Sequence, residues 1–176
     1  KLQTFVGEGM LSLSKRVVDF CGGEKQLYDL FYQDYRQNYS EEPYKYSTLM
    51  SGVKETLDFF YRNSVPMGIC TNKRQFVTEK LIDQMNLKIF FNVIVGARDS
   101  IPLKPQPDML QLAMSQFNTT KTSFLMVGDT INDIASAKAA QIESVAIAGG
   151  YTDVDVKTLN ADYTLDNMRD IISLFK

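Results

Sequence analysis

The sequence predicts an α/β fold: a doubly wound parallel sheet, forming a Rossmann-like core, with a small all-helical cap. Up to about residue 47, apolar residues recur at the spacing of amphipathic helices, and from residue 52 onward short apolar runs alternate with such helices. Strands and helices in alternation are typical of a parallel sheet covered on both faces. The chain has 176 residues, of which 44% are hydrophobic, so it can bury a sizeable core.

The first predicted region, residues 1–47, is the cap. Leu13, Val17 and Phe20 recur at helical spacing until two glycines end the run, and a second helical pattern continues to the polar stretch 38–43. These patterns predict a helical hairpin or a small bundle. A cluster of aromatic residues in the second helix is interpreted as cap core, with an interface as the alternative: Phe31, Tyr32, Tyr35 and Tyr39.

The second predicted region, residues 48–176, is the core. Its short apolar runs are predicted to be buried strands, and they cover residues 65–70, 91–96, 123–127 and 144–148, with a weaker run at 161–164. Helices are predicted before, between and after these strands, each from apolar residues at helical spacing: Val53 and Leu57, Val77 and Leu81, Met109 and Ala113, Ala135 and Ala139, Met168 and Ile171.

The composition excludes several functions. A net charge of -2 and a pI near 5.2, with no run rich in Lys or Arg, give no attraction to nucleic acid or to an anionic membrane. No apolar stretch approaches the roughly 18 residues of a membrane span, and the first residues lack the apolar centre of a signal peptide, so a cytoplasmic location is expected. The absence of histidine leaves the chemistry to carboxylates and lysines. Cys21 and Cys70 are expected to be reduced, partly buried thiols.

Candidate functional residues follow the predicted strands, because ligands of such sheets gather at the carboxyl ends of the strands. Thr71 and Asn72 follow the first strand, where a hydroxyl, an amide and the free N–H groups of a helix start suit an anion. The alternative is that one of them only caps that helix. Lys104 follows the second strand among prolines that restrict its backbone, with an ordinary surface lysine as the alternative.

A pair of carboxylates follows the third predicted strand. Asp129 comes directly after the apolar run, and Asp133 comes four residues later, just inside the next predicted helix. Mg²⁺ is usually held by one or two carboxylates together with waters and substrate phosphate, so this spacing suits Mg²⁺. The alternative is that Asp129 caps the helix and Asp133 lies on its solvated face. The three strand ends together predict a phosphate and magnesium site at one edge of the sheet.

Three short segments resemble the second, third and fourth motifs of the haloacid dehalogenase-like superfamily: 71–73 (TNK), 104–108 (KPQPD) and 128–133 (GDTIND). Their order and spacing are similar to those of its phosphoglycolate phosphatase-like branch, which carries a helical cap after the first core strand. Residues 1–47 resemble most of such a cap. The segment 149–151 (GGY) resembles the stretch after the next core strand, so the resemblance covers nearly the whole chain.

This resemblance implies a role for each matching residue. Thr71 and Asn72 would bind the transferring phosphoryl group, and Lys104 would neutralise its charge. Asp129 would ligate Mg²⁺, and Asp133 would hold the waters of the ion or position Lys104. The implied reaction is magnesium-dependent hydrolysis of a small phosphorylated metabolite, a phosphomonoester of the phosphoglycolate type, through an aspartyl-phosphate. The fold does not choose between this substrate and other phosphate compounds.

One motif of the family has no counterpart in this chain. The first motif, Asp-x-Asp-Gly-Thr, supplies the nucleophile and the general acid on a strand between those that correspond here to 65–70 and 123–127. Asp153 and Asp155 form a similar pair, but no Gly-Thr follows them. We therefore expect the nucleophile in a segment upstream of Lys1, and the present segment alone to be inactive. The alternatives are a shortened relative in which the two flanking strands pair directly, and a non-catalytic phosphate-binding or regulatory module.

Overall fold

The computed structural model describes the chain apart from residues 1–4, 7, 118–123, 151–153 and 176. Its elements confirm the predicted α/β fold, and 3-10 helices are labelled η. In chain order they are α1 (Met10–Phe20), α2 (Leu27–Glu41), α3 (Val53–Arg62), β1 (Gly68–Arg74), α4 (Gln75–Gln84), η2 (Lys88–Phe90), β2 (Val93–Ala97), α5 (Asp108–Ser115), β3 (Leu125–Gly128), α6 (Ile131–Ala139), β4 (Glu143–Ile147), η3 (Val156–Leu159), β5 (Tyr163–Leu165) and η4 (Met168–Phe175).

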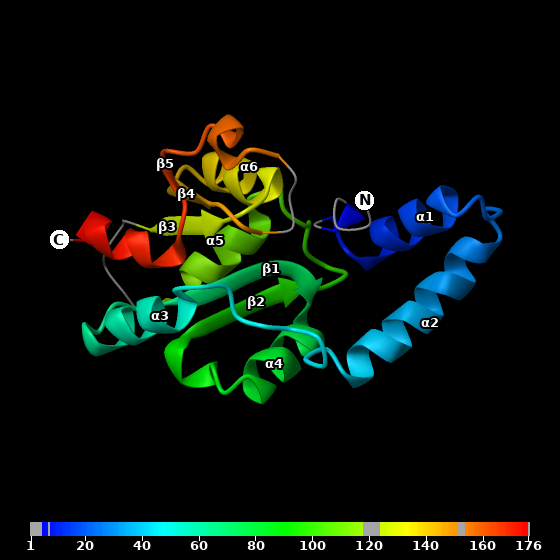
Figure 1. Cartoon of the computed structure of the whole chain (residues 1–176), viewed down its shortest axis with the longest axis horizontal. Coiled ribbons are helices and arrows are strands. Elements are labelled where there is room, and N and C mark those ends of the chain that lie inside the picture. Colours follow the sequence, from blue (N-terminus) through cyan, green and yellow to red (C-terminus); the bar gives the residue numbers. More distant parts are fainter. Residues whose placement is uncertain (1–4, 7, 118–123, 151–153, 176) are drawn as a thin grey trace.

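Helices α1 and α2 form a hairpin beside the sheet-containing core (Figure 1), which is the expected helical cap. Within α1, Ser14 and Val18 are buried, and the Ser14 hydroxyl donates to the Met10 carbonyl oxygen at 2.8 Å. Helix α2 buries no residue completely. Instead, half-buried side chains at intervals of three or four residues lie along one side of α2: Tyr28, Tyr32, Tyr35 and Tyr39. This spacing places the four tyrosines on one face of the helix.

The strands of the core are all parallel, but they form two sheets. Strand β1 pairs with β2, and β4 lies between β3 and β5. In Figure 1, β1 and β3 are the facing edges of the two sheets. No ladder joins these edges within the described residues. The alternative in which the two flanking strands pair directly is therefore wrong, and the doubly wound core is interrupted between β1 and β3.

Helices cover both faces of the sheets. On the face that is nearer in Figure 1, Phe60 of α3 packs with Val145 and Ile147 of β4 and with Ile171 of η4. The residue between the two β4 positions, Ala146, packs against α6 instead. Successive side chains of a strand point to opposite faces, so β4 is buried on both sides, as its continuous apolar run predicts.

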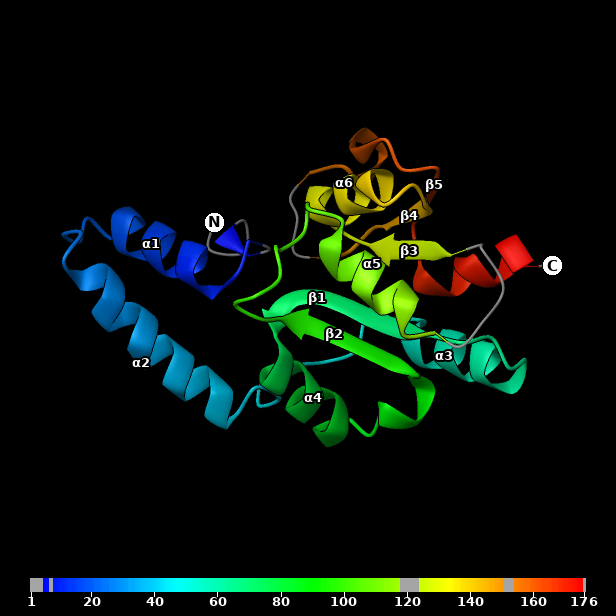
Figure 2. The ribbon, with the colours of Figure 1, turned by 180° about the vertical axis from the view of Figure 1, so that it is seen from behind.

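Helix α5 lies across the interruption between the two sheets (Figure 2). Its Met109 packs against Val95 of β2. The next residue, Leu110, packs with Met126 of β3 and with Cys70 of β1. Apolar packing against α5 therefore connects the facing edges of β1 and β3, although no hydrogen-bonded ladder does so.

The structure differs from the sequence-based expectation at several element boundaries. Strand β1 begins at Gly68 and continues to Arg74, so it includes the segment 71–73 that we expected to follow the strand. The last predicted helix is the 3-10 helix η4. Its apolar residues Met168 and Ile171 are three positions apart, and residues at this spacing share one face of a 3-10 helix. No helix in the described part of the chain is long and apolar enough to cross a membrane.

Candidate functional site

The carboxyl ends of β1 and β3 lie on the side of the core that faces the α1–α2 hairpin (Figure 1). They line a cavity of about 480 Å³. Its core side contains all of the site residues predicted from the sequence: Thr71, Asn72, Lys104, Asp129 and Asp133. Its cap side is formed by the hairpin and the residues before it: Val6, Gly9, Met10, Leu13, Tyr35 and Tyr39. The structure thus brings residues from three separate segments together between cap and core.

A β-bulge shapes the end of β1. Thr71 and Arg74 pair with consecutive residues of β2, so Asn72 and Lys73 are the additional residues of the bulge. Bulges bend a strand and change the direction of its side chains, and they are frequent beside active sites. Helix α4 follows with Arg74 at its N-cap position and no side-chain cap. The alternative that Thr71 or Asn72 only caps this helix is therefore wrong.

The side chain of Asn72 holds the backbone of Lys104. Its amide nitrogen donates to the Lys104 carbonyl oxygen, and its amide oxygen accepts from the Lys104 backbone N–H, both at 2.9 Å. Two hydrogen bonds to one residue fix both the position and the orientation of that backbone. The Lys104–Pro105 peptide bond is cis. Asn72, predicted as a phosphate ligand, is thus also placed to position the lysine.

Lys104 is buried, with 7% of its surface exposed. Its ammonium donates to Asp133 Oδ1 at 2.6 Å and to the carbonyl oxygen of Cys70 at 2.6 Å. A buried charge persists only where it is paired and hydrogen-bonded, so the alternative of an ordinary surface lysine is wrong. Burial of Cys70 raises the pKa of its thiol to about 11, and the positive charge of Lys104 opposes this increase.

Asp133 connects this lysine to the start of α6. Its Oδ2 accepts from the Thr130 backbone N–H at 3.0 Å and from the Thr130 hydroxyl at 2.7 Å. Thr130 is the N-cap residue of α6, and the reciprocal contacts form a capping box. Asp133 is 6% exposed. The alternative in which Asp129 caps the helix and Asp133 lies on a solvated face is therefore wrong.

Two glycines leave room for the two carboxylates. A Cβ atom on Gly128 would lie 2.3 Å from the Cβ of Asp133, and one on Gly150 would lie 1.8 Å from Oδ2 of Asp129. Either substitution would displace an acid, because these separations are far below van der Waals contact. Gly150 follows β4, so this strand end also contributes to the site. Tyr151, the last residue of the segment GGY, lies outside the described residues.

The carboxylate of Asp129 suits a hydrated Mg²⁺ as a ligand. Both oxygens of Asp133 already accept hydrogen bonds, from Lys104 and from Thr130. Among the residues that the structure describes, no group of three acidic or cysteine side chains gathers into a metal cage. Mg²⁺ does not need one, since it keeps several waters and uses one or two carboxylates plus substrate phosphate. Asp129 could hold the ion, and Asp133 is placed to position Lys104.

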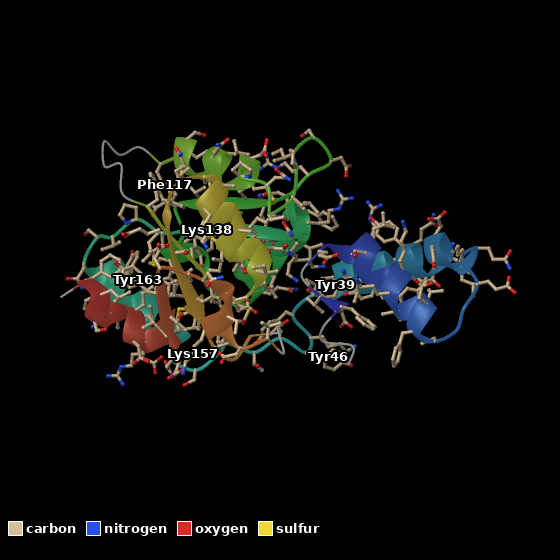
Figure 3. The ribbon with its side chains drawn as sticks, turned by 90° about the horizontal axis from the view of Figure 1, so that it is seen from above. Tyr39, Tyr46, Phe117, Lys138, Lys157 and Tyr163 are labelled. Carbon is tan, nitrogen blue, oxygen red and sulfur yellow. The ribbon has the colours of Figure 1, made fainter. Side chains whose placement is uncertain are left out.

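The cap contacts the core through α2. The Lys73 ammonium donates to the Tyr39 hydroxyl and lies 4.5 Å from the centroid of that ring. Lys80 of α4 donates to the carbonyl oxygens of Ser40 and Glu41, at 3.0 and 2.6 Å, at the C-terminal end of α2. Figure 3 shows Tyr39 on the side of the hairpin that faces the core. Tyr39 therefore contacts the core, so the interpretation as cap core does not describe it fully.

Two further expectations concern the cysteines and the pair Asp153 and Asp155. Cys70 is a half-buried free thiol as expected, but Cys21 is exposed, because it follows the last turn of α1. Asp155 accepts from the Lys157 backbone N–H at 3.0 Å as the N-cap of η3, whereas Asp153 lies outside the described residues. The Asp155 carboxylate thus has a structural role in a turn.

Sequence reasoning missed several contributors to the site. Thr130 carried a detectable signal, because a threonine followed three residues later by an acid is the pattern of a capping box. Gly150 stood in a segment noted only for its resemblance. The contact of Lys73 with Tyr39 joins residues 34 positions apart, so no local pattern indicates it.

A Rossmann-like core, a helical cap and a cavity of carboxylates and lysines at the strand ends define the class as a capped α/β protein. The sequence family described as haloacid dehalogenase-like hydrolase matches residues 11–147, and the chain belongs to this family.

Within the family, the chain falls in the phosphoglycolate phosphatase-like branch. A phosphoglycolate phosphatase of Chromobacterium violaceum is 29% identical over 181 residues, covering 100% of this chain and 80% of the relative. A phosphoglycolate phosphatase of Nitrosococcus oceani is 31% identical over 179 residues, covering 99% and 79%. A solved structure described as a predicted phosphoglycolate phosphatase from Haemophilus somnus has a TM-score of 0.90 at 24% identity, covering 99% of this chain and 81% of that one. This last likeness shows the fold.

Proposed function

We propose that the protein hydrolyses a small phosphomonoester of the phosphoglycolate type, using Mg²⁺ and an aspartyl-phosphate. One observation carries the proposal: a buried lysine, Lys104, is paired with Asp133 and clamped by Asn72 at a cavity that also presents Thr71 and Asp129. A buried ion pair adds little net stability compared with apolar residues of the same volume, which favours a role in ligand binding. The phosphatase names of the relatives support the same activity.

In the proposed reaction, each of these residues acts on charge or position. Lys104 places a fixed positive charge at the cavity, and the Thr71 hydroxyl donates to a phosphoryl oxygen. Asp129 holds Mg²⁺, which when bound supplies further positive charge to the phosphate oxygens. Asp133 and Asn72 keep the lysine from reorienting. Preorganised charge of this kind is the main protein contribution to phosphoryl transfer.

We propose that the nucleophile and the general acid belong to a further strand between β1 and β3. These edges lie in separate sheets, and α5 packs across both. A strand placed there would give both edges ladder partners, and each satisfied buried backbone group is worth on the order of 1–3 kcal/mol. Its carboxylate would attack phosphorus while the ester oxygen leaves with a proton from the general acid. Water would then hydrolyse the aspartyl-phosphate, releasing phosphate and restoring the carboxylate.

The cap, assigned to residues 1–47, would close the cavity over the substrate, and the core, residues 48–176, would carry the chemistry. The cap side of the cavity consists of apolar and aromatic residues among those described. Such a wall excludes water, which strengthens the electrostatic interactions of the core side.

A phosphatase screen in the presence of Mg²⁺, on the protein that includes the strand proposed between β1 and β3, tests the proposal. Asp129→Asn and Lys104→Ala are each expected to lower hydrolysis by about 100-fold or more. Lys54→Ala and Asp58→Asn are matched controls, because these residues form an exposed pair on α3 at 3.5 Å, away from the cavity. Full activity in Asp129→Asn would contradict the proposal. Retained phosphate binding without any turnover would instead support a non-catalytic binding module.

A further inference from the structure

We infer that Lys73 selects phosphoesters whose leaving group carries a second anionic substituent, and that Tyr39 of the cap positions Lys73 for this contact. The inference rests on the proposed function of the same cavity and deepens it. It assigns a specificity-determining residue to the core and a positioning residue to the cap.

The two lysines among the described residues of the cavity lie at different depths. The Lys104 ammonium lies against the carbonyl oxygen of Cys70 and against Asp133, at the buried end of the cavity. Lys73 follows Cys70 in the bulge at the carboxyl end of β1, the end that faces the cap. Its ammonium contacts Tyr39 of α2. Lys104 is therefore placed for the phosphoryl group, and Lys73 for what extends from it toward the cap.

The cap side of the cavity contributes no charged side chain among the described lining residues. A substituent that extends from the phosphoryl group toward the cap therefore meets apolar and aromatic side chains, with Lys73 as the cation beside them. A charge removed from water needs an opposite charge close by. This environment thus favours an anionic substituent over a neutral one and disfavours a cationic one.

Tyr39 restricts a side chain that is otherwise flexible. The Lys73 ammonium donates to the hydroxyl and lies 4.5 Å from the ring centroid, which combines a hydrogen bond with a cation–π contact. The ring is itself stacked on Tyr35, with centroids 5.6 Å apart. Burial raises the pKa of Tyr39, so its hydroxyl stays neutral.

The adjacent cation, Arg74, provides a contrast. It donates to the exposed carboxylate of Asp99 at 2.5 Å and interacts with Tyr32 of α2, and both contacts raise the pKa of Arg74. Arg74 lines a neighbouring hollow that shares Gly9, Met10 and Asn72 with the cavity, whereas Lys73 lines the cavity that contains Lys104. Of these two successive cations, Lys73 is therefore the one directed at the candidate site.

Binding of two phosphonates of nearly equal size tests the inference. Phosphonoacetate carries a carboxylate beyond its phosphonate group, and phosphonoacetamide carries a neutral amide there. Calorimetry on the purified protein in magnesium chloride gives both dissociation constants, and their ratio is the readout. We expect phosphonoacetate to bind about tenfold more tightly, the usual advantage of a charge-assisted hydrogen bond. The ratio requires no turnover, so loss of this selectivity and failure of hydrolysis are separate results.

Three variants and one control show which residues produce the preference for phosphonoacetate over phosphonoacetamide. Lys73→Gln is expected to weaken phosphonoacetate binding by about tenfold and to leave phosphonoacetamide binding unchanged. Lys73→Arg keeps the charge and is expected to retain most of the preference. Tyr39→Phe keeps the ring but loses the hydroxyl, and we expect the ratio to fall about threefold. Lys80→Gln is the matched control, because Lys80 also holds α2 but does not line the cavity, and its ratio is expected to stay unchanged.

Several outcomes would overturn the inference. An equal loss of both phosphonates in Lys73→Gln would assign Lys73 to the phosphoryl group. An unchanged ratio in that variant, or no binding of either phosphonate by the unmodified protein, would also exclude the role. Circular dichroism reports whether each variant is folded. If Lys73→Gln does not fold, the ratios of Lys73→Arg and Tyr39→Phe decide, and a ratio in Tyr39→Phe equal to that of the unmodified protein excludes the positioning role of Tyr39.

Discussion

Replacing Asp133 by Asn is expected to lower the free energy of unfolding by about 3–5 kcal/mol, the usual cost of removing one partner of a buried ion pair. The side chains of Lys104 and Asp133 are 7% and 9% exposed and their charged atoms are 2.6 Å apart. The carboxylate accepts from Lys104 with one oxygen and from Thr130 with the other. An amide has a single oxygen and cannot serve both. The variant therefore loses the charge and also leaves a buried donor without its acceptor.

Thermal unfolding followed by circular dichroism measures this cost. In a domain of this size, 1 kcal/mol corresponds to roughly 2–4 °C, so the midpoint is expected to fall by about 6–20 °C. Glu42→Gln is the control, because it breaks an ion pair with Lys45 whose side chains are 61% and 51% exposed. Such an exposed pair contributes less than about 1 kcal/mol. A midpoint change in Asp133→Asn no larger than in Glu42→Gln would refute the reasoning.

A double variant separates the pairing from other effects of the substitution. Adding Lys104→Met to Asp133→Asn removes both charges, so no unpaired charge remains buried. The loss of stability is then expected to be smaller than the sum of the two single losses, by about 1–3 kcal/mol. Strict additivity of the two losses would show that the ion pair is not what stabilises this part of the protein.

Three further predictions concern other parts of the fold. Burial raises the pKa of Cys70 from 9.0 to about 11, so Ellman's reagent should modify exposed Cys21 first. The stability that the neutral Cys70 thiol contributes should be complete below pH 9 and lost as the pH rises through about 11. Faster labelling of Cys70, or urea unfolding that does not change over this range, would contradict this. Gly150→Ala places a Cβ 1.8 Å from Asp129 Oδ2. In the protein that includes the strand proposed between β1 and β3, phosphatase activity should therefore fall by about 100-fold with little change in melting temperature. Unchanged kinetics would show that the added Cβ does not displace Asp129. Met109→Ala removes a side chain with 0% exposure and should lower the free energy of unfolding in urea by about 2–5 kcal/mol. A smaller loss would mean that neighbouring side chains fill the space left by Met109.

The positions of the site residues were predictable because each one follows a predicted strand in the sequence. Each of the segments 71–73, 104–108 and 128–133 follows an apolar run, 104–108 after a short connection, and parallel strands end at one edge of a sheet. The structure places all three segments at one cavity. The haloacid dehalogenase-like family and the α/β fold with a helical cap were predictable for the same reason, from short motifs and from hydrophobic period. Strand boundaries were less accurate, since the bulge that extends β1 depends on pairing with β2.

The roles of individual polar groups were not predictable in this way. Asp133 reads equally well as a magnesium ligand, as a helix-surface acid or as a partner of Lys104, and only its burial against that lysine distinguishes them. Asn72 likewise reads as a phosphate ligand, and its two hydrogen bonds to the Lys104 backbone become visible only when the segments are brought together. The contact of Lys73 with Tyr39 is of the same kind.

By itself, then, the sequence determined the alternation of strands and helices, the family, and the edge at which the candidate site lies. These follow from periodicity and chain direction, which neighbouring residues encode. The tertiary structure alone decided which side chains pair, which glycines make room for the acids, and that the core is divided between β1 and β3. Burial, distance and hydrogen-bond geometry depend on segments far apart in the chain, and no local pattern contains them.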